Sequence, residues 1–366
     1  MKKYAYYELS VLQYIFLIHG TQIGIGVLTI PRELAEQAGT DGWISLFIGW
    51  AAAVLVSLVT TNMMKRYPDK TIIDIFHLLL GKWLGKVATI FMCMYCGFAA
   101  TVLFVNTTAI INVWILSQTP GYIIVALFAI PAYIVVQGGL RVIGRYSELV
   151  FYLTLWMPLV LATALRDAHW LHFLPLIKEG WMPIVLASKT TVLSFLGFEL
   201  AYFVYPFLQK KQYASIGIVV ANTLTLLVYL YITIICYTFF CPDEITQYTW
   251  PTLNLWKVIE YRFLERIDII FLAFYLFILS TTAMTYMYFT VFSTSQLFNS
   301  PDHRKHLLVF LCLVSVAAWL YTPSFIEVNT ITETWSFVGM LFAYLLPLLA
   351  WGPIWLSKRN ERGEKA

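Results

Sequence analysis

The chain has 366 residues, of which 60% are hydrophobic and 12% charged, with a mean hydropathy of +0.74 and a formal net charge of +4. A soluble domain carries about 25% charged residues, so this composition excludes an ordinary water-soluble fold and indicates a polytopic membrane protein in a lipid bilayer. The net charge is small and no basic cluster is interleaved with aromatic residues, so nucleic acid is not an expected partner.

Solid apolar runs predict an all-α integral membrane fold with ten transmembrane helices, because lipid permits only helices or closed barrels and these runs do not alternate. In chain order the predicted spans cover residues 10–37, 42–62, 84–113, 121–138, 146–166, 181–208, 213–240, 267–297, 305–322 and 333–357. We expect a single membrane domain, residues 1–366, made of a first repeat (1–166), a second repeat (181–357) and a basic cytoplasmic tail (358–366).

The distribution of charge predicts the orientation of these spans. With both termini in the cytoplasm, 17 of the 24 basic residues fall in inner segments: Lys2, Lys3, Lys65, Arg66, Lys70, Lys82, Lys86, Arg141, Arg145, Lys210, Lys211, Arg304, Lys305, Lys358, Arg359, Arg362 and Lys365. Acidic residues such as Glu33, Asp41 and Asp243 fall in outer segments. An odd number of spans would break this alternation.

Two connections carry structure of their own. The segment "YPDKTIIDIFHLLLGKWLGK" (67–86) has apolar residues at helical spacing and predicts an amphipathic helix at the inner surface, with His77 at the interface. The longest outer connection, from Pro242 to Arg266, is expected to cap the outer mouth of the protein.

The first span contains "HGTQIGIG" (His19 to Gly26), an unfavourable sequence for a helix that only crosses lipid. At about 28 residues this span would be roughly 42 Å long, more than an upright crossing needs. We expect a break between Gly20 and Gly26, with a second half-helix that ends near Pro31. Exposed N–H groups there would attract an anion and exposed carbonyls a cation, as a zwitterionic amino acid requires.

The alternative interpretation is that Gly20-x-x-x-Gly24 only lets two helices pack closely. The sixth span, Trp181 to Leu208, favours the break, because it is also about 28 residues long and has Gly197 and Glu199 near its middle. It opens the second half of the chain as the first span opens the first half. Paired broken spans predict a five-plus-five inverted repeat with a central binding site.

Glu199 is predicted to lie at membrane depth, where an unpaired carboxylate is costly. Three roles remain open: it holds a ligand ammonium, takes up a proton, or caps the second half of its span. Lys189 is ten residues earlier and is expected to face the outer vestibule. The five cysteines, including the Cys93-x-x-Cys96 pair, are interpreted as packing residues, and we expect neither a metal, a cofactor nor enzymatic activity.

Several motifs together resemble one family: "Q-x8-QIGIGVLTIP" from Gln13, "AGTDGW" from Ala38, "YPDKTIIDI" followed by "GKWLGK", "SFLGFE" and "WPTLNLW". They are similar to the spore germination permease family, the B subunits of spore germinant receptors, within the amino acid–polyamine–organocation transporters. The resemblance runs from about Glu8 to the end of the tenth span.

This resemblance implies a protein of the spore inner membrane that binds a small germinant, most simply an amino acid, and acts with an A-type subunit and a C-type lipoprotein subunit. It also implies a pocket between the broken parts of spans 1 and 6 and the faces of spans 3 and 8. The positions are Thr21, Gly24, Ile25, Gly26, Tyr95, Ser194, Leu196, Gly197, Glu199, Thr282 and Tyr286.

Thr282 and Tyr286 are four residues apart and are expected to share one helical face. Thr281 and Thr282 would also suit a sodium site, although no acidic ligand is evident beside them. Two functions remain in contention: a sensor whose ligand shifts an equilibrium between two conformations, and a secondary amino-acid permease that takes up a proton on Glu199. Sequence alone does not separate them, because both need the same cavity.

Overall fold

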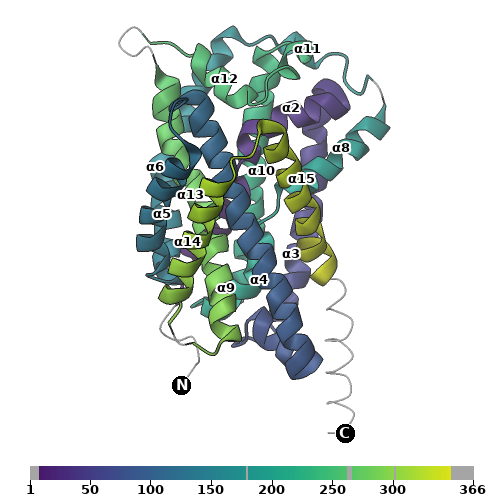
Figure 1. Ribbon diagram of the computed structural model, residues 1–366. Coiled ribbons are helices and arrows are strands. Elements are labelled where there is room, and N and C mark those ends of the chain that lie inside the picture. The colour runs from purple at the N-terminus through teal and green to yellow at the C-terminus, as the bar shows by residue number, and fades with distance from the viewer. Residues whose placement is uncertain (1–7, 179, 262–265, 301, 348–366) are drawn as a thin grey trace, which may run out of the picture.

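The computed structural model describes residues 8–178, 180–261, 266–300 and 302–347, and Figure 1 shows them as a bundle of helices that run side by side. The α-helices are α1 Val11–Ile23, α2 Gly26–Ala38, α3 Gly42–Met64, α4 Ile72–Trp114, α5 Gly121–Val136, α6 Leu140–Thr154, α7 Trp156–Leu161, α8 Trp181–Ser194, α9 Ala201–Val204, α10 Ala214–Phe239, α11 Pro242–Ile245, α12 Pro251–Val258, α13 Ile267–Leu297, α14 Arg304–Leu320 and α15 Phe325–Met340. A π-helical turn, Leu341–Leu345, extends α15. The predicted tail, 358–366, and the end of the tenth span lie outside the described residues.

The bundle has the apolar helices that a membrane fold requires. Five of the described helical stretches are long and apolar enough to cross a bilayer, or six when the bent pair Trp181–Ser194 and Phe198–Phe207 counts as one span. The all-α membrane fold is therefore confirmed, whereas the count of ten spans, the position of the termini and the division into repeats stay predictions.

Local sequence determines where three of the helices begin. Ser10, Thr71 and Ser324 each accept a hydrogen bond from the backbone three residues later, and the side chain at that later position bonds back, which completes a capping box. These boxes satisfy N–H groups that the first helical turn cannot pair. The starts of α1, α4 and α15 are thus encoded locally, before any tertiary packing.

The segment between spans 2 and 3 is helical, as predicted, and its position at a membrane surface stays a prediction. It is the first arm of α4, whose two helical arms meet in a kink at Gly81, where φ is +76°. A Cβ atom on Gly85 would lie 2.7 Å from Nδ1 of His77, so the two arms of the bend pack closely. Trp83 and Leu84 remain exposed on this bend, which projects from the lower end of the bundle in Figure 1.

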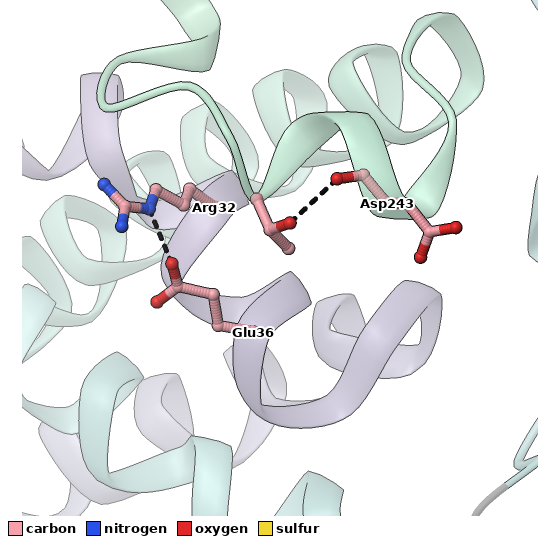
Figure 2. A network of polar contacts seen from close by, with 4 residues as sticks. Arg32, Glu36 and Asp243 are labelled. Carbon is pink, nitrogen blue, oxygen red and sulfur yellow. Dashed lines mark hydrogen bonds and ion pairs between the residues drawn. The ribbon is translucent and has the colours of Figure 1, made fainter.

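The connection between α10 and α13 covers one end of the bundle, as predicted for a cap. Its described part carries α11 and α12, which Figure 1 places above α2. The hydroxyl of Thr252 in α12 donates to the carbonyl of Val27 at 2.8 Å, and Trp256 is buried. Figure 2 shows the neighbouring turn of α11 beside the Arg32–Glu36 ion pair of α2. In this pair, Nε of Arg32 lies 2.6 Å from Oε1 of Glu36.

Candidate functional site

The first predicted break is present and is narrower than expected. Helix α1 ends at Ile23 and α2 begins at Gly26, and between them Gly24 adopts φ +38°, which favours glycine. The expectation that the second half ends near Pro31 is wrong, because α2 contains Pro31 and continues to Ala38. The proline does not stop the helix there.

The second predicted break is also present. Helix α8 ends at Ser194, Gly197 has φ +125°, and a short 3₁₀ turn from Phe198 to Leu200 leads into α9 with a bend of 42°. A Cβ atom on Gly197 would lie 3.0 Å from the backbone nitrogen of Gln22. The backbones of the two breaks are therefore in direct contact, and a side chain at position 197 would force them apart.

Glu199 sits at this junction and is completely buried. One carboxylate oxygen accepts hydrogen bonds from the hydroxyls of Tyr95 in α4 and Tyr286 in α13, each at 2.7 Å. The other oxygen accepts the backbone N–H of Gly197 at 2.6 Å. Tyr95, Tyr286 and Gly197, which the family resemblance implied for one pocket, thus meet on a single carboxylate. The bond from Gly197 is the kind expected for the capping role, one of the three considered for Glu199.

Aromatic residues from the end of the chain cover this cluster. Phe342 stacks on Tyr95 with ring centroids 4.7 Å apart, and Trp335 packs edge-on against Tyr286 at 6.0 Å. A Cβ atom on Gly339 would lie 2.5 Å from Leu196, so α15 fits closely over the second break. Sequence reasoning missed Trp335 and Phe342, because neither stands out in an apolar helix rich in aromatic residues.

Side-chain donors from α13 bond carbonyls at and near the first break, where the sequence predicted exposed carbonyls that attract a cation. The hydroxyl of Thr282 donates to the carbonyl of Gly20 at 2.9 Å. The hydroxyl of Thr281 lies 3.2 Å from the same carbonyl and 2.7 Å from the carbonyl of Ile278 in its own helix, so its one hydrogen is shared between them. Tyr275 donates to the carbonyl of Gly24 at 2.5 Å. The two threonines are thus already engaged with the carbonyl that would have been their partner in a sodium site.

The side chain of Gln22 in α1 is the centre of a second polar cluster, which links both breaks to α10. Sequence reasoning missed this cluster. The amide of Gln22 donates to the carbonyl of Phe195 at 2.9 Å and to Asn222 at 2.7 Å, and its oxygen accepts from Thr225 at 2.8 Å. Thr225 also bonds His19 at 2.9 Å. Polar residues inside the predicted spans 1 and 7 were the available signal, since buried polar groups need partners.

The remaining predicted residues lie at the breaks, but two of them turn away from the cluster. The hydroxyls of Thr21 and Ser194 donate to Leu17 and Thr190 of their own helices at 2.6 and 2.9 Å. Ile25 lies between the half-helices. Thr282 and Tyr286 do share one face of α13, and both point toward the breaks through the bonds described above.

The members of the Glu199 cluster contact one another directly. A small cavity of about 20 Å³ lies elsewhere, between α4, α5 and α13, and is lined by residues that include Phe104, Thr107 and Met284. It has room for about one water molecule. The five cysteines are free thiols, and no cluster of metal-binding side chains occurs in the described ranges.

Residues 8–326 match the family described as spore germination protein. The chain belongs to this family. Relatives along nearly its whole length include spore germination protein YndE of Bacillus subtilis, 27% identical over 98% of both chains. Spore germination protein GerQB of Bacillus cereus is 24% identical over 94% of this chain and 95% of its own. Spore germination protein A2 of B. subtilis is 25% identical over 96% and 97%.

Two solved transporters share the fold. The structure of MhsT in complex with L-phenylalanine has a TM-score of 0.65 at 14% identity and covers 94% of this chain and 98% of its own. The closed structure of Mhp1, a nucleobase-cation-symport-1 family transporter with bromovinylhydantoin bound, has a TM-score of 0.64 at 11% identity, over 93% and 79%. At these identities the likeness establishes a transporter-type fold and nothing about ligands. This protein is therefore a membrane member of a spore germination family with a transporter-type fold, and that family is not one of enzymes.

Proposed function

We propose that this protein is the ligand-sensing membrane subunit of a spore germinant receptor, which binds a small amino acid between its two helix breaks. The observation that carries the proposal is the buried carboxylate of Glu199 at the contact between those breaks. The setting is the spore inner membrane, and the partners are an A-type and a C-type (lipoprotein) subunit. The family match and the relatives named as spore germination proteins support this setting.

The chemistry of the junction suits a zwitterion. An ionised carboxylate offers about four acceptor positions, and Tyr95, Tyr286 and Gly197 occupy three of those on Glu199. A ligand ammonium would replace one of the two tyrosine hydroxyls on this carboxylate. On the opposite side, α2 begins at Gly26 without a side-chain cap, so its first N–H groups and its positive dipole end can receive a carboxylate.

Ligand entry requires the cluster to open, because Tyr95 and Tyr286 now contact each other and Glu199 directly. A ligand favours the open arrangement only to the extent that it binds that arrangement more tightly. In the proposed mechanism the ammonium and carboxylate groups supply this difference, since they bond the carboxylate and the half-helix N-terminus. Partner subunits then respond to the altered position of the broken spans.

The test uses spores in which this receptor is the only one present, exposed to a panel of small amino acids. The proposal expects germination with at least one of them, and a germinant concentration for half response that rises in Glu199→Gln. Germination that is identical without this protein would refute it. Uptake of labelled alanine into proteoliposomes decides the permease alternative: saturable uptake that Tyr286→Phe abolishes would replace sensing by transport as the function.

A further inference from the structure

The hydroxyl group of Tyr229 in α10 lies close to three backbone carbonyl oxygens. The side chain is completely buried, and its oxygen lies 2.9 Å from the carbonyl oxygen of Gln22, 3.3 Å from that of Ile23 and 3.0 Å from that of Ser194. The first two carbonyls end the half-helix α1, and the third ends the half-helix α8. A single atom thus touches the ends of both broken spans.

The number of protons does not match the number of acceptors. A phenol hydroxyl has one hydrogen, so it can satisfy one of the three carbonyls fully, or share its hydrogen between two of them. Carbonyls at helix ends also carry the negative part of the helix dipole. Three such oxygens around one point form the kind of cage in which broken membrane helices hold a monovalent cation. Here the tyrosine oxygen occupies the centre of the cage.

We propose that Tyr229 is a positioning residue that joins the two breaks, and that its hydroxyl stands where a monovalent cation would otherwise be required. One consequence is that amino-acid binding does not depend on sodium. This consequence rests on the proposed function, because it requires that the protein binds an amino acid. The structural part of the proposal stands independently, because the contacts among Tyr229, Gln22 and Ser194 need no ligand.

The glycine at position 26 fits the same arrangement. A Cβ atom there would lie 2.8 Å from the Tyr229 hydroxyl, closer than side chains tolerate, so glycine at this position leaves the hydroxyl its place in the cage. The ring of Phe195 packs edge-on against Tyr229, with centroids 5.7 Å apart. The hydroxyl is therefore fixed between the breaks rather than free to rotate away.

The test compares Tyr229→Phe with Tyr237→Phe in the full-length protein in nanodiscs. Tyr237 is the matched control, because it lies on the same helix, is equally buried, and its hydroxyl has no hydrogen-bond partner in the described part of the chain. Thermal unfolding is measured without ligand in N-methylglucamine, sodium and lithium chloride at equal ionic strength. Binding of labelled alanine is then measured in the same three salts.

In N-methylglucamine chloride, Tyr229→Phe is expected to unfold about 2–8 °C below the wild type, because carbonyls of both breaks lose their donor. Sodium or lithium should restore much of that difference by entering the vacated space. Alanine binding by this variant should weaken about tenfold or more in N-methylglucamine chloride and recover in sodium. For the wild type, and likewise for Tyr237→Phe, the unfolding temperature and the affinity for alanine should be the same in all three salts.

Three results would overturn the proposal: wild-type binding that requires sodium, a Tyr229→Phe protein indistinguishable from Tyr237→Phe, or a loss in Tyr229→Phe of equal size in every salt. The two proposals fail separately. A wild type that binds no amino acid in any salt would refute the proposed function, and the unfolding series would still decide whether Tyr229 joins the breaks.

Discussion

Replacing Glu199 by glutamine separates the roles that the buried carboxylate can play. Glutamine keeps the size of the side chain, and its oxygen can accept the backbone N–H of Gly197. The hydroxyls of Tyr95 and Tyr286 can rotate to accept from the new amide N–H groups. We therefore expect Glu199→Gln to fold and to reach the membrane at normal abundance.

The effect should fall on ligand binding instead. A hydrogen bond between a ligand ammonium and a buried carboxylate contributes about 1.5–3 kcal/mol, more than the same bond to a neutral amide. If most of this is lost, the half-saturating concentration of the amino acid should rise roughly 10- to 150-fold. A chemically similar ligand without an amino group should bind equally weakly to both proteins, because it never used the charge.

Two assays measure this change: binding of labelled alanine in nanodiscs, and the germination response of spores that carry this receptor alone. The control is Glu36→Gln, since Glu36 is an exposed acid of α2 that pairs with Arg32 away from the cluster. It should shift the response less than about twofold. A Glu199→Gln protein whose dose response matches that of the control would show that the carboxylate does not hold the ammonium.

Three further substitutions test the geometry of the breaks. Gly26→Val places atoms against the Tyr229 hydroxyl, so the germination response should be lost while protein abundance on immunoblots stays near normal. Gly197→Ala must adopt φ +125° and should lower the free energy of unfolding by about 1–3 kcal/mol, measured by thermal unfolding in nanodiscs. Gly339→Ala brings a methyl group against Leu196, and the resulting loss of stability should be relieved in the double variant with Leu196→Ala; independent, additive effects would show that α15 does not press on the break.

The positions of the breaks could be predicted because their cause is local. Gly24 and Gly197 adopt positive φ angles that other residues rarely take, so glycine in a long apolar run signals the interruption directly. The orientation of side chains next to the breaks could not be predicted in the same way. Thr21 and Ser194 were expected to face a ligand, but hydroxyls within helices often bond the carbonyl four residues earlier.

The groups that cap the exposed carbonyls were beyond sequence reasoning for a different reason. Tyr229 and Tyr275 meet carbonyls more than 200 positions earlier in the chain, and this protein has 23 tyrosines. Nothing in the local sequence distinguishes a tyrosine that packs from one whose hydroxyl reaches a helix end. Tyr95 and Tyr286 were identified only through the family resemblance, and Phe342 and Trp335 depend on how α15 packs.

The contacts between the two broken spans bear on how a ligand signal would leave the site. At the break the spans touch through Gly197 and Gln22, and at the end where the described chain begins they touch again. There the backbone N–H of Leu9 donates to Phe207 at 2.7 Å, and that of Gln209 donates back to Leu9 at 3.0 Å. Two segments joined at two levels cannot move independently without breaking buried or backbone hydrogen bonds. In the proposed mechanism, a ligand that displaces one break would therefore displace both spans together, and a partner subunit would respond to the movement of the pair.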